Sequence, residues 1–361
     1  MNKIKVLVTG ACGVTSRSVV RSLNMSPLFS KTFSFIGTDV CYNPYGLYEG
    51  LYDKVYKVPY TSSPDYRNII ENIIYENEIR YAIVIPELEV LYWCENPFSV
   101  PFYRIPLNFA KLVISKKRLY EALSKTDLIP KWQICDRNDL LSNKMVSLKY
   151  PFWIRDYEEG TTSGRGACKV NDIEELRAWV TINKGINSYM LSEYLPGRNL
   201  CCFTLYKDGI LLKYGVAQRI QYIMSKVAVS GITGNINVGK LLNDELTVNR
   251  VVKSINKLTK ITGEKMNGLV VTDLKCDEND IPKVTEINIR HIATTSSFAC
   301  AGLNFAEMQM LCLMGRETEL SSEKTILFPT DNAILRDVDG RPLYVSHYKE
   351  LNIGEYFPLL D

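Results

Sequence analysis

Two carboxylates and an amide lie close together around a predicted hairpin turn. Glu286 and Asn288 are two residues apart, so they share one face of a strand. If the turn is centred between Asn279 and Asp280, Asp273 lies directly across from Glu286. Like charges that face each other on a sheet are unfavourable unless something neutralises them. A divalent cation does so, and Mg²⁺ commonly takes one or two carboxylates together with substrate phosphates.

Arg290 continues the same face and adds a cation beside the carboxylates. Such a cation suits the charge of a transferring phosphoryl group or of a tetrahedral intermediate. Judged on this hairpin alone, a surface strand with ordinary salt bridges explains the residues equally well. A magnesium site therefore needs support from elsewhere in the chain.

A glycine-rich loop at residues 160–166 joins two predicted strands, 152–157 and 167–170. Glycine lets backbone amides approach phosphate oxygens closely, and the Thr and Ser hydroxyls add donors. A Walker loop would run into a helix and end in Gly-Lys-Ser/Thr, which this loop lacks. A flexible hairpin is the alternative. Arg155, on the entering strand, offers a fixed cation near the same phosphates and favours a lid over a nucleotide.

The first hundred residues alternate short apolar runs with helical periods, which predicts a parallel sheet wrapped by helices, a Rossmann-like α/β unit. After residue 108 the pattern changes to one helical stretch, 109–123, and then to strands separated by hairpin turns near 207–209, 277–280 and 339–340. Hairpins indicate antiparallel sheet. Asp172 and Glu175 resemble a capping box that opens a helix. The second part is therefore predicted to be α+β.

Composition excludes several classes of protein. The 361 residues carry a formal charge of +3, from 43 basic and 40 acidic residues, too little for non-specific nucleic-acid binding. The 10 cysteines show no CxxC pair or Cys/His metal spacing and are interpreted as reduced thiols. No apolar stretch is long enough to cross a bilayer, and the apolar start suits a strand. We expect a cytoplasmic chain without nucleic-acid or membrane partners, and a homodimer stays open.

Taken in order, several segments resemble the ATP-grasp superfamily, particularly its carbamoyl-phosphate-synthetase-like members. Residues 115–123 with 128–130 look like the opening of the family's nucleotide domain, and Lys116 takes the place of a phosphate-contacting basic residue. Ser115 replaces the usual aspartate. Residues 150–155 resemble a strand on which most members have lysine where this chain has Arg155. The resemblance implies that both cations contact the phosphates of ATP.

Two further segments complete the resemblance, which spans about residues 3 to 310. Residues 192–197 look like the adenine hinge, in which Glu193 and the backbone around Tyr194 and Leu195 would face the base. Asn199 falls where the family commonly has a ribose-binding glutamate. Residues 286–290 resemble the family's metal-binding strand, with Ile289 in place of proline, and residues 301–304 match the next segment of the family's pattern.

The resemblance implies an α/β Rossmann-like pre-ATP-grasp domain (1–112) followed by an α+β ATP-grasp fold with antiparallel sheets, divided into a lid subdomain (113–190) and a catalytic subdomain with a C-terminal hairpin (191–361). It implies a ligase that uses ATP and Mg²⁺, or Mn²⁺, to join a small carboxylate to an amine through an acyl phosphate. From the residues and the resemblance together we expect Asp273, Glu286 and Asn288 as metal ligands, and Arg290 and Arg219 as catalytic cations. The expected nucleotide-binding residues are Lys116, Arg155, Ser163, Gly164, Gly166, Glu193, Tyr194, Leu195 and Asn199.

Two other functions stay open. The turn at residues 9–16 places glycines between a strand and a helix, where free amides can hold an anion, and Asp39 could bind a ribose, as in an NAD(P)-dependent oxidoreductase. A non-catalytic ATP-binding protein is the second, supported by Ser115, Asn199 and Ile289. The run 86–89 resembles a segment that borders the substrate region in the family. His291 either lines the acceptor site or is structural.

Overall fold

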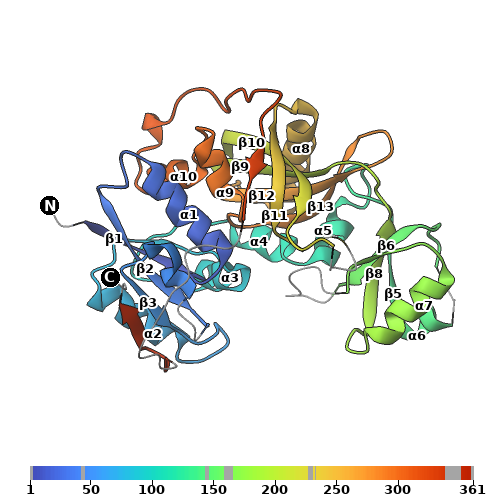
Figure 1. The fold of residues 1–361 in the computed structure, drawn as a ribbon, viewed down its shortest axis with the longest axis horizontal. Helices are drawn as coiled ribbons and strands as arrows, with labels where there is room; N and C mark the ends of the chain where they lie inside the picture. Colours follow the sequence, from blue (N-terminus) through green and yellow to red (C-terminus); the bar gives the residue numbers. More distant parts are fainter. Residues whose placement is uncertain are drawn as a thin grey trace.

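Three sheets contain the strands of the computed structural model, which describes residues 3–41, 45–142, 146–157, 166–226, 231, 233–337 and 351–358. Figure 1 shows the N-terminal sheet and a smaller sheet at opposite ends of the long axis, with the largest sheet between them. We call the smaller one the lid sheet (β5 to β8) and the largest one the central sheet (β9 to β14). No described helix is long and apolar enough to cross a membrane.

The N-terminal sheet has the order β15-β3-β2-β1-β4 and is parallel except at β15, which pairs antiparallel with β3. Val6, Leu7 and Val8 are fully buried, as expected for a parallel strand covered on both faces. The alternation predicted from the sequence is confirmed. The strands are β1 (Ile4–Thr9), β2 (Phe33–Asp39), β3 (Lys54–Lys57), β4 (Tyr81–Ile83) and β15 (Tyr356–Pro358), and the helices are α1 (Val14–Met25), η1 (Tyr45–Gly50), α2 (Tyr66–Glu76) and α3 (Glu87–Glu95).

The predicted single helix over residues 109–123 is wrong, because the chain forms two helices, α4 (Leu107–Val113) and α5 (Lys116–Leu123). Ser115 separates them with an extended backbone, and its Oγ accepts a hydrogen bond from the Arg118 N–H at 3.4 Å. A serine at this position satisfies one of the free N–H groups at a helix start. The break places Lys116 in the first turn of a new helix.

The lid sheet has the order β5-β8-β6-β7 and its own apolar core, which includes Phe152 and Val180. Asp172 caps α7 by accepting hydrogen bonds from two N–H groups of the first turn, as predicted. The sheet begins at Trp132, whereas Leu119 of α5 belongs to the same core as Leu258 of α8. The elements are β5 (Trp132–Asp136), α6 (Arg137–Leu141), β6 (Phe152–Asp156), β7 (Cys168–Val170), α7 (Ile173–Ile182) and β8 (Ser188–Glu193).

The central sheet is antiparallel, with the order β13-β12-β9-β10-β11-β14. Asp208 and Gly209 have φ angles of 51° and 89°, so the predicted hairpin between β9 and β10 is confirmed. The predicted hairpin at 339–340 lies outside the described residues. The elements are β9 (Asn199–Lys207), β10 (Ile210–Tyr222), β11 (Ile236–Leu242), α8 (Glu245–Thr262), β12 (Gly268–Cys276), β13 (Pro282–Asn288), α9 (Thr295–Cys300), α10 (Phe305–Leu313), η2 (Glu317–Glu319) and β14 (Ile334–Leu335).

Hydrogen bonds between α1 and the segment after β13 join the N-terminal sheet to the central sheet. Ser18 is fully buried, donates to the Ala293 carbonyl at 3.0 Å and accepts from the Ser296 N–H at 2.8 Å. Asn304 Nδ2 donates to the Ser22 carbonyl at 2.6 Å. The segment that follows the predicted metal-binding strand is thus fixed against the N-terminal unit.

We predict that Ser18→Ala lowers the free energy of unfolding by ~1–3 kcal/mol, because it leaves the buried Ser296 N–H and the Ala293 carbonyl without their partner. Urea denaturation followed by circular dichroism measures the change. Ser142→Ala is the matched control, since its Oγ bonds to the Asn138 carbonyl at an exposed helix end. Equal, small losses in both variants would contradict the structural role of Ser18.

Candidate active site

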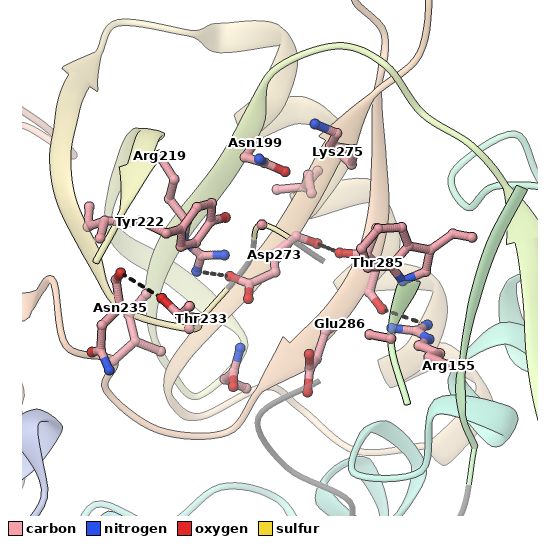
Figure 2. Close-up of a pocket in the computed structure, with 18 of the residues that line it drawn as sticks. Arg155, Asn199, Arg219, Tyr222, Thr233, Asn235, Asp273, Lys275, Thr285 and Glu286 are labelled. Atoms are coloured by element: carbon pink, nitrogen blue, oxygen red, sulfur yellow. Dashed lines mark hydrogen bonds and ion pairs between the residues drawn. The ribbon is translucent and has the colours of Figure 1, made fainter. Parts of the chain in front are cut away.

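A cavity of about 960 Å³ lies where the three sheets meet. It is lined by Thr15 and Glu87 from the N-terminal unit, Lys116 from α5, Arg155 from the lid sheet and Asp273 from the central sheet. Figure 2 shows Arg155, Arg219, Asp273 and Glu286 directed into this space. The cavity therefore brings together residues that are far apart in the sequence.

The predicted opposition of two carboxylates is confirmed, since Asp273 pairs with Glu286 across β12 and β13. The strand register that produces this pairing differs from the one that the sequence indicated. Near the turn Lys275 pairs with Lys283, which centres the turn on Asn279, and a register shift follows between Asp273 and Leu274. The extra residue of this bulge is Thr285, whose Oγ donates to the Asp273 carbonyl at 3.1 Å.

Cations neutralise both carboxylates in this structure. Arg219 Nη2 lies 2.5 Å from Asp273 Oδ1 (Figure 2), and Lys116 Nζ lies 3.4 Å from Glu286 Oε1. A third carboxylate, Glu87 at the start of α3, lies 3.8 Å from Arg290 Nε. Of the run 86–89, Glu87 lines the cavity.

The two carboxylates have opposite pKa shifts. Burial raises the pKa of Asp273, and Arg219 opposes this shift. Burial also disfavours the ionised form of Glu286, yet Lys116 and Arg155 outweigh it and hold the pKa of Glu286 below its ordinary value. The Glu286 side chain is 36% exposed, so its carboxylate is ionised and open to the cavity.

The end of β8 and the segment that follows it connect the lid sheet to the central sheet, and they line the cavity with Glu193, Tyr194 and Leu195. Glu193 Oε1 accepts from the Lys131 N–H at 3.1 Å, and the ammonium of Lys169 lies 4.5 Å from the centre of the Tyr194 ring. Among the described residues, the backbone N–H and carbonyl groups of Tyr194 and Leu195 form no hydrogen bond with another backbone group. Their backbone groups are therefore available to a ligand.

Of the other predicted nucleotide-binding residues, some line the cavity and some do not. Arg155 lines the cavity, donates to the Thr285 carbonyl at 3.4 Å and lies 5.4 Å above the ring of Tyr120. Asn199 also lines it. Gly166 is outside the lining, because it packs so tightly on Ile186 that an added Cβ would lie 2.4 Å from the Ile186 side chain. The predicted residues Ser163 and Gly164 lie outside the described part of the chain.

Several lining residues were not predicted from the sequence. Lys275 is two residues from Asp273 on β12, and Trp153 is two residues from Arg155 on β6. Strand alternation places such pairs on one face, so the signal was present in the spacing. Lys169 lies on β7, for which no chemical motif pointed to the cavity.

The N-terminal turn lines the cavity through Val14 and Thr15. Asp39, the predicted ribose ligand of a dinucleotide enzyme, accepts hydrogen bonds from the Cys12 and Cys41 N–H groups, each at 2.8 Å. Both carboxylate oxygens thus stabilise the loops at the ends of β1 and β2. This contact explains Asp39 without a nicotinamide cofactor.

The three predicted magnesium ligands, Asp273, Glu286 and Asn288, all line the cavity. Asn288 lines the cavity, and its Nδ2 donates to the Val271 carbonyl at 3.3 Å, which leaves the amide oxygen for a ligand. Among the described residues no group of three or more His, Cys, Asp or Glu side chains could hold a metal. Two carboxylates and an amide oxygen fit a cation whose remaining ligands are phosphate and water.

No protein family model matches the sequence, and no curated protein matches it. Solved structures do match. An L-amino acid ligase from Bacillus licheniformis superposes with a TM-score of 0.63 and 14% identity, over 90% of this chain and 77% of that chain. An N5-carboxyaminoimidazole synthetase from Staphylococcus aureus, complexed with ADP, gives 0.64 and 12% identity, over 92% of this chain and 81% of that chain.

The biotin carboxylase domain dimer of a Hydrogenobacter thermophilus 2-oxoglutarate carboxylase, in complex with MgADP and bicarbonate, gives a TM-score of 0.60 and 16% identity, over 89% of this chain and 71% of that chain. These enzymes share the ATP-grasp fold, and this chain therefore has that fold. The fold expected from the motifs is confirmed, with both antiparallel sheets in place.

His291 is a structural residue and not part of the cavity lining. It is 2% exposed, and its Nδ1 lies 3.1 Å from Thr295 Oγ1. Burial lowers its pKa from 6.5 to about 3.

We predict that His291 stays neutral between pH 8 and pH 5. His347 is the only other histidine in the chain. In a His347→Gln variant, ¹⁵N-histidine NMR should show one imidazole that does not titrate in this range. Because the folded-state pKa is depressed, the stabilisation is fully present above pH 6.5 and is lost as the pH falls towards 3. A midpoint near 6.5 in the folded protein would contradict the burial.

Proposed function

We propose that this chain is an ATP- and Mg²⁺-dependent ligase that joins a carboxylate to an amine through an acyl phosphate. The observation that carries the proposal is the pairing of Asp273 with Glu286 at the floor of a cavity that several cations also line. The solved enzymes of the same fold support it, because their ligands include ADP and MgADP.

In the proposed site the nucleotide lies between the lid sheet and the central sheet. The backbone of Tyr194 and Leu195 faces the base, and Lys116 and Arg155 contact the phosphates. Asp273, Glu286 and Asn288 would hold the metal, which would neutralise phosphate charge. Lys116, now in contact with Glu286, would contact a phosphate oxygen. Ser163 and Gly164, two further predicted nucleotide-binding residues, lie outside the described residues.

The proposed reaction has two steps, the transfer of the γ-phosphoryl group to the carboxylate and the transfer of the acyl group to the amine. A carboxylate oxygen of the substrate attacks the γ-phosphorus, the bond to the β,γ-bridging oxygen breaks, and ADP leaves. The amine then attacks the acyl carbon, phosphate leaves with the electron pair of the C–O bond, and the nitrogen loses a proton. Arg290 and Arg219 lie where they can stabilise the negative charge of both steps.

The domain boundaries follow from this proposal, with residues 1–112 as the pre-ATP-grasp domain, 113–190 as the lid subdomain and 191–361 as the catalytic subdomain. The packing of α5 against α8 places the first residues of the lid segment with the catalytic subdomain. Lys116, in the first turn of α5, therefore lies on the side of the cavity that the central sheet forms.

A non-catalytic ATP-binding protein is the second candidate, because Arg219 already occupies Asp273 and because Ser115, Asn199 and Ile289 depart from the family. The two candidate functions differ in whether the protein releases ADP from bound ATP. An ADP-release assay across amino acids and small carboxylates, paired with amines, supports the ligase if one pair accelerates release. ATP binding without release for any pair supports the second candidate. Binding of NAD in preference to ATP would contradict both.

We predict that Glu286→Gln abolishes ADP release, because it removes the ionised oxygen that Lys116 and Arg155 keep deprotonated. A loss of one charge-assisted ligand costs about 1.5–3 kcal/mol or more, so the affinity for Mg²⁺ falls at least ~10-fold and higher Mg²⁺ concentrations do not restore the wild-type rate. Steady-state rates at several Mg²⁺ concentrations measure it. Glu278→Gln, in the turn of the same hairpin, is the matched control and keeps wild-type rates. Unchanged turnover in Glu286→Gln would refute the metal assignment.

A further inference from the structure

One wall of the cavity carries a cation that the proposed reaction does not use. Arg336 follows β14, at the edge of the central sheet opposite the metal-binding hairpin, and lines the same cavity. We propose that Arg336 binds an oxyanion of the substrate other than the carboxylate that is phosphorylated, so that the substrate class is an acid with a second, distal carboxylate or phosphate. This inference rests on the proposed ligase function.

The backbone of Arg336 is fixed, but its guanidinium has few partners. The Arg336 N–H donates to the Asn237 carbonyl at 2.8 Å, and Nη1 donates to the Ile236 carbonyl at 3.2 Å. Within the described ranges no ion pair includes Arg336, whereas Lys116, Arg219 and Arg290 each lie beside a carboxylate. A guanidinium has five N–H donors in a planar fork, so donors remain for a ligand in the cavity.

Among the described residues, no acidic side chain forms an ion pair with Arg336. Burial, together with the nearby cation Arg21 of α1, lowers the pKa of Arg336 to about 10, so the side chain is still charged at neutral pH. Arg21 has its own partner, Glu49, at 2.9 Å. A partly buried cation beside another cation is unfavourable unless an anion neutralises it. Of the two arginines, only Arg336 lines the cavity.

The sheet fixes the separation between Arg336 and the proposed reaction centre. Arg219 on β10 pairs with Gly239 on β11, which pairs with Ile334 on β14, and Arg336 is two residues further along. Two strand spacings across and two residues along give a distance of roughly 12 Å between the backbones of Arg219 and Arg336. The polar residues Thr233 and Asn235 line the cavity with them (Figure 2).

This separation sets the shape of the substrate. Both arginines line the cavity, so the two anionic groups that they bind are expected to be separated by a few carbon atoms and not by a long chain. An acid that carries only the reacting carboxylate would leave Arg336 without a counter-charge. Extended dicarboxylates and phosphorylated acids satisfy both arginines.

The test is calorimetric titration of the full chain, in the presence of Mg²⁺ and a non-hydrolysable ATP analogue, with two matched pairs of acids. The pairs are butyrate with glutarate, and serine with O-phosphoserine. In the wild type we expect the dianionic member of one pair to bind ~10–100-fold more tightly, because a hydrogen-bonded charge pair contributes that much to affinity. The preferred pair identifies the group as a carboxylate or a phosphate.

Arg336→Gln should abolish this preference while binding of the monoanion is unchanged, and Arg336→Lys should retain part of it. Arg316→Gln, which removes an arginine that pairs with Glu319 outside the cavity lining, is the control and keeps the wild-type preference. A preference that persists in Arg336→Gln, or no preference in the wild type, would overturn the inference. The analogue itself is titrated first, so failure of the wild type to bind it refutes the proposed function separately.

Discussion

Two acidic side chains on neighbouring antiparallel strands impose the main constraint on this molecule. Asp273 and Glu286 face each other from β12 and β13, and such a pair is stable only when positive charge lies close to both. In this structure Arg219 and Lys116 provide that charge, from a strand on one side and a helix start on the other. The elements around the hairpin therefore have to bring cations to it, and the same cations are suited to a polyphosphate.

The three sheets meet this constraint because charged side chains from each part of the fold line the same cavity. The central sheet supplies the carboxylates, the break at Ser115 starts a helix that presents Lys116, and the lid sheet contributes Arg155 from above. Hydrogen bonds around Ser18 hold α1 against the segment that follows β13, so Glu87 and Arg290 meet in the cavity. The cavity thus extends from Tyr194 beside the lid sheet to Thr15 and Glu87 of the N-terminal unit.

Much of this arrangement could be predicted from the sequence. Strand alternation and hairpin turns predicted β9, β10, β12 and β13, and register arithmetic placed Asp273 opposite Glu286, although the bulge at Thr285 was needed to produce that pairing. The break between α4 and α5 was missed, because residues 109–123 have continuous helical periodicity and only the cap at Ser115 interrupts it. Arg336 could not be found from motifs, since its position depends on the pairing of β14 with β11, a long-range contact without a local signal.

The most direct measurement is anomalous X-ray diffraction from crystals of the chain grown with Mn²⁺ and a non-hydrolysable ATP analogue. Manganese has the same preference for oxygen ligands as magnesium, and its anomalous signal identifies its position directly. The predicted result is a peak between the carboxylates of Asp273 and Glu286, with Arg219 displaced from its present contact. A nucleotide bound in the cavity with its metal peak elsewhere, or with both ion pairs unchanged, would contradict the claim that these two carboxylates are metal ligands.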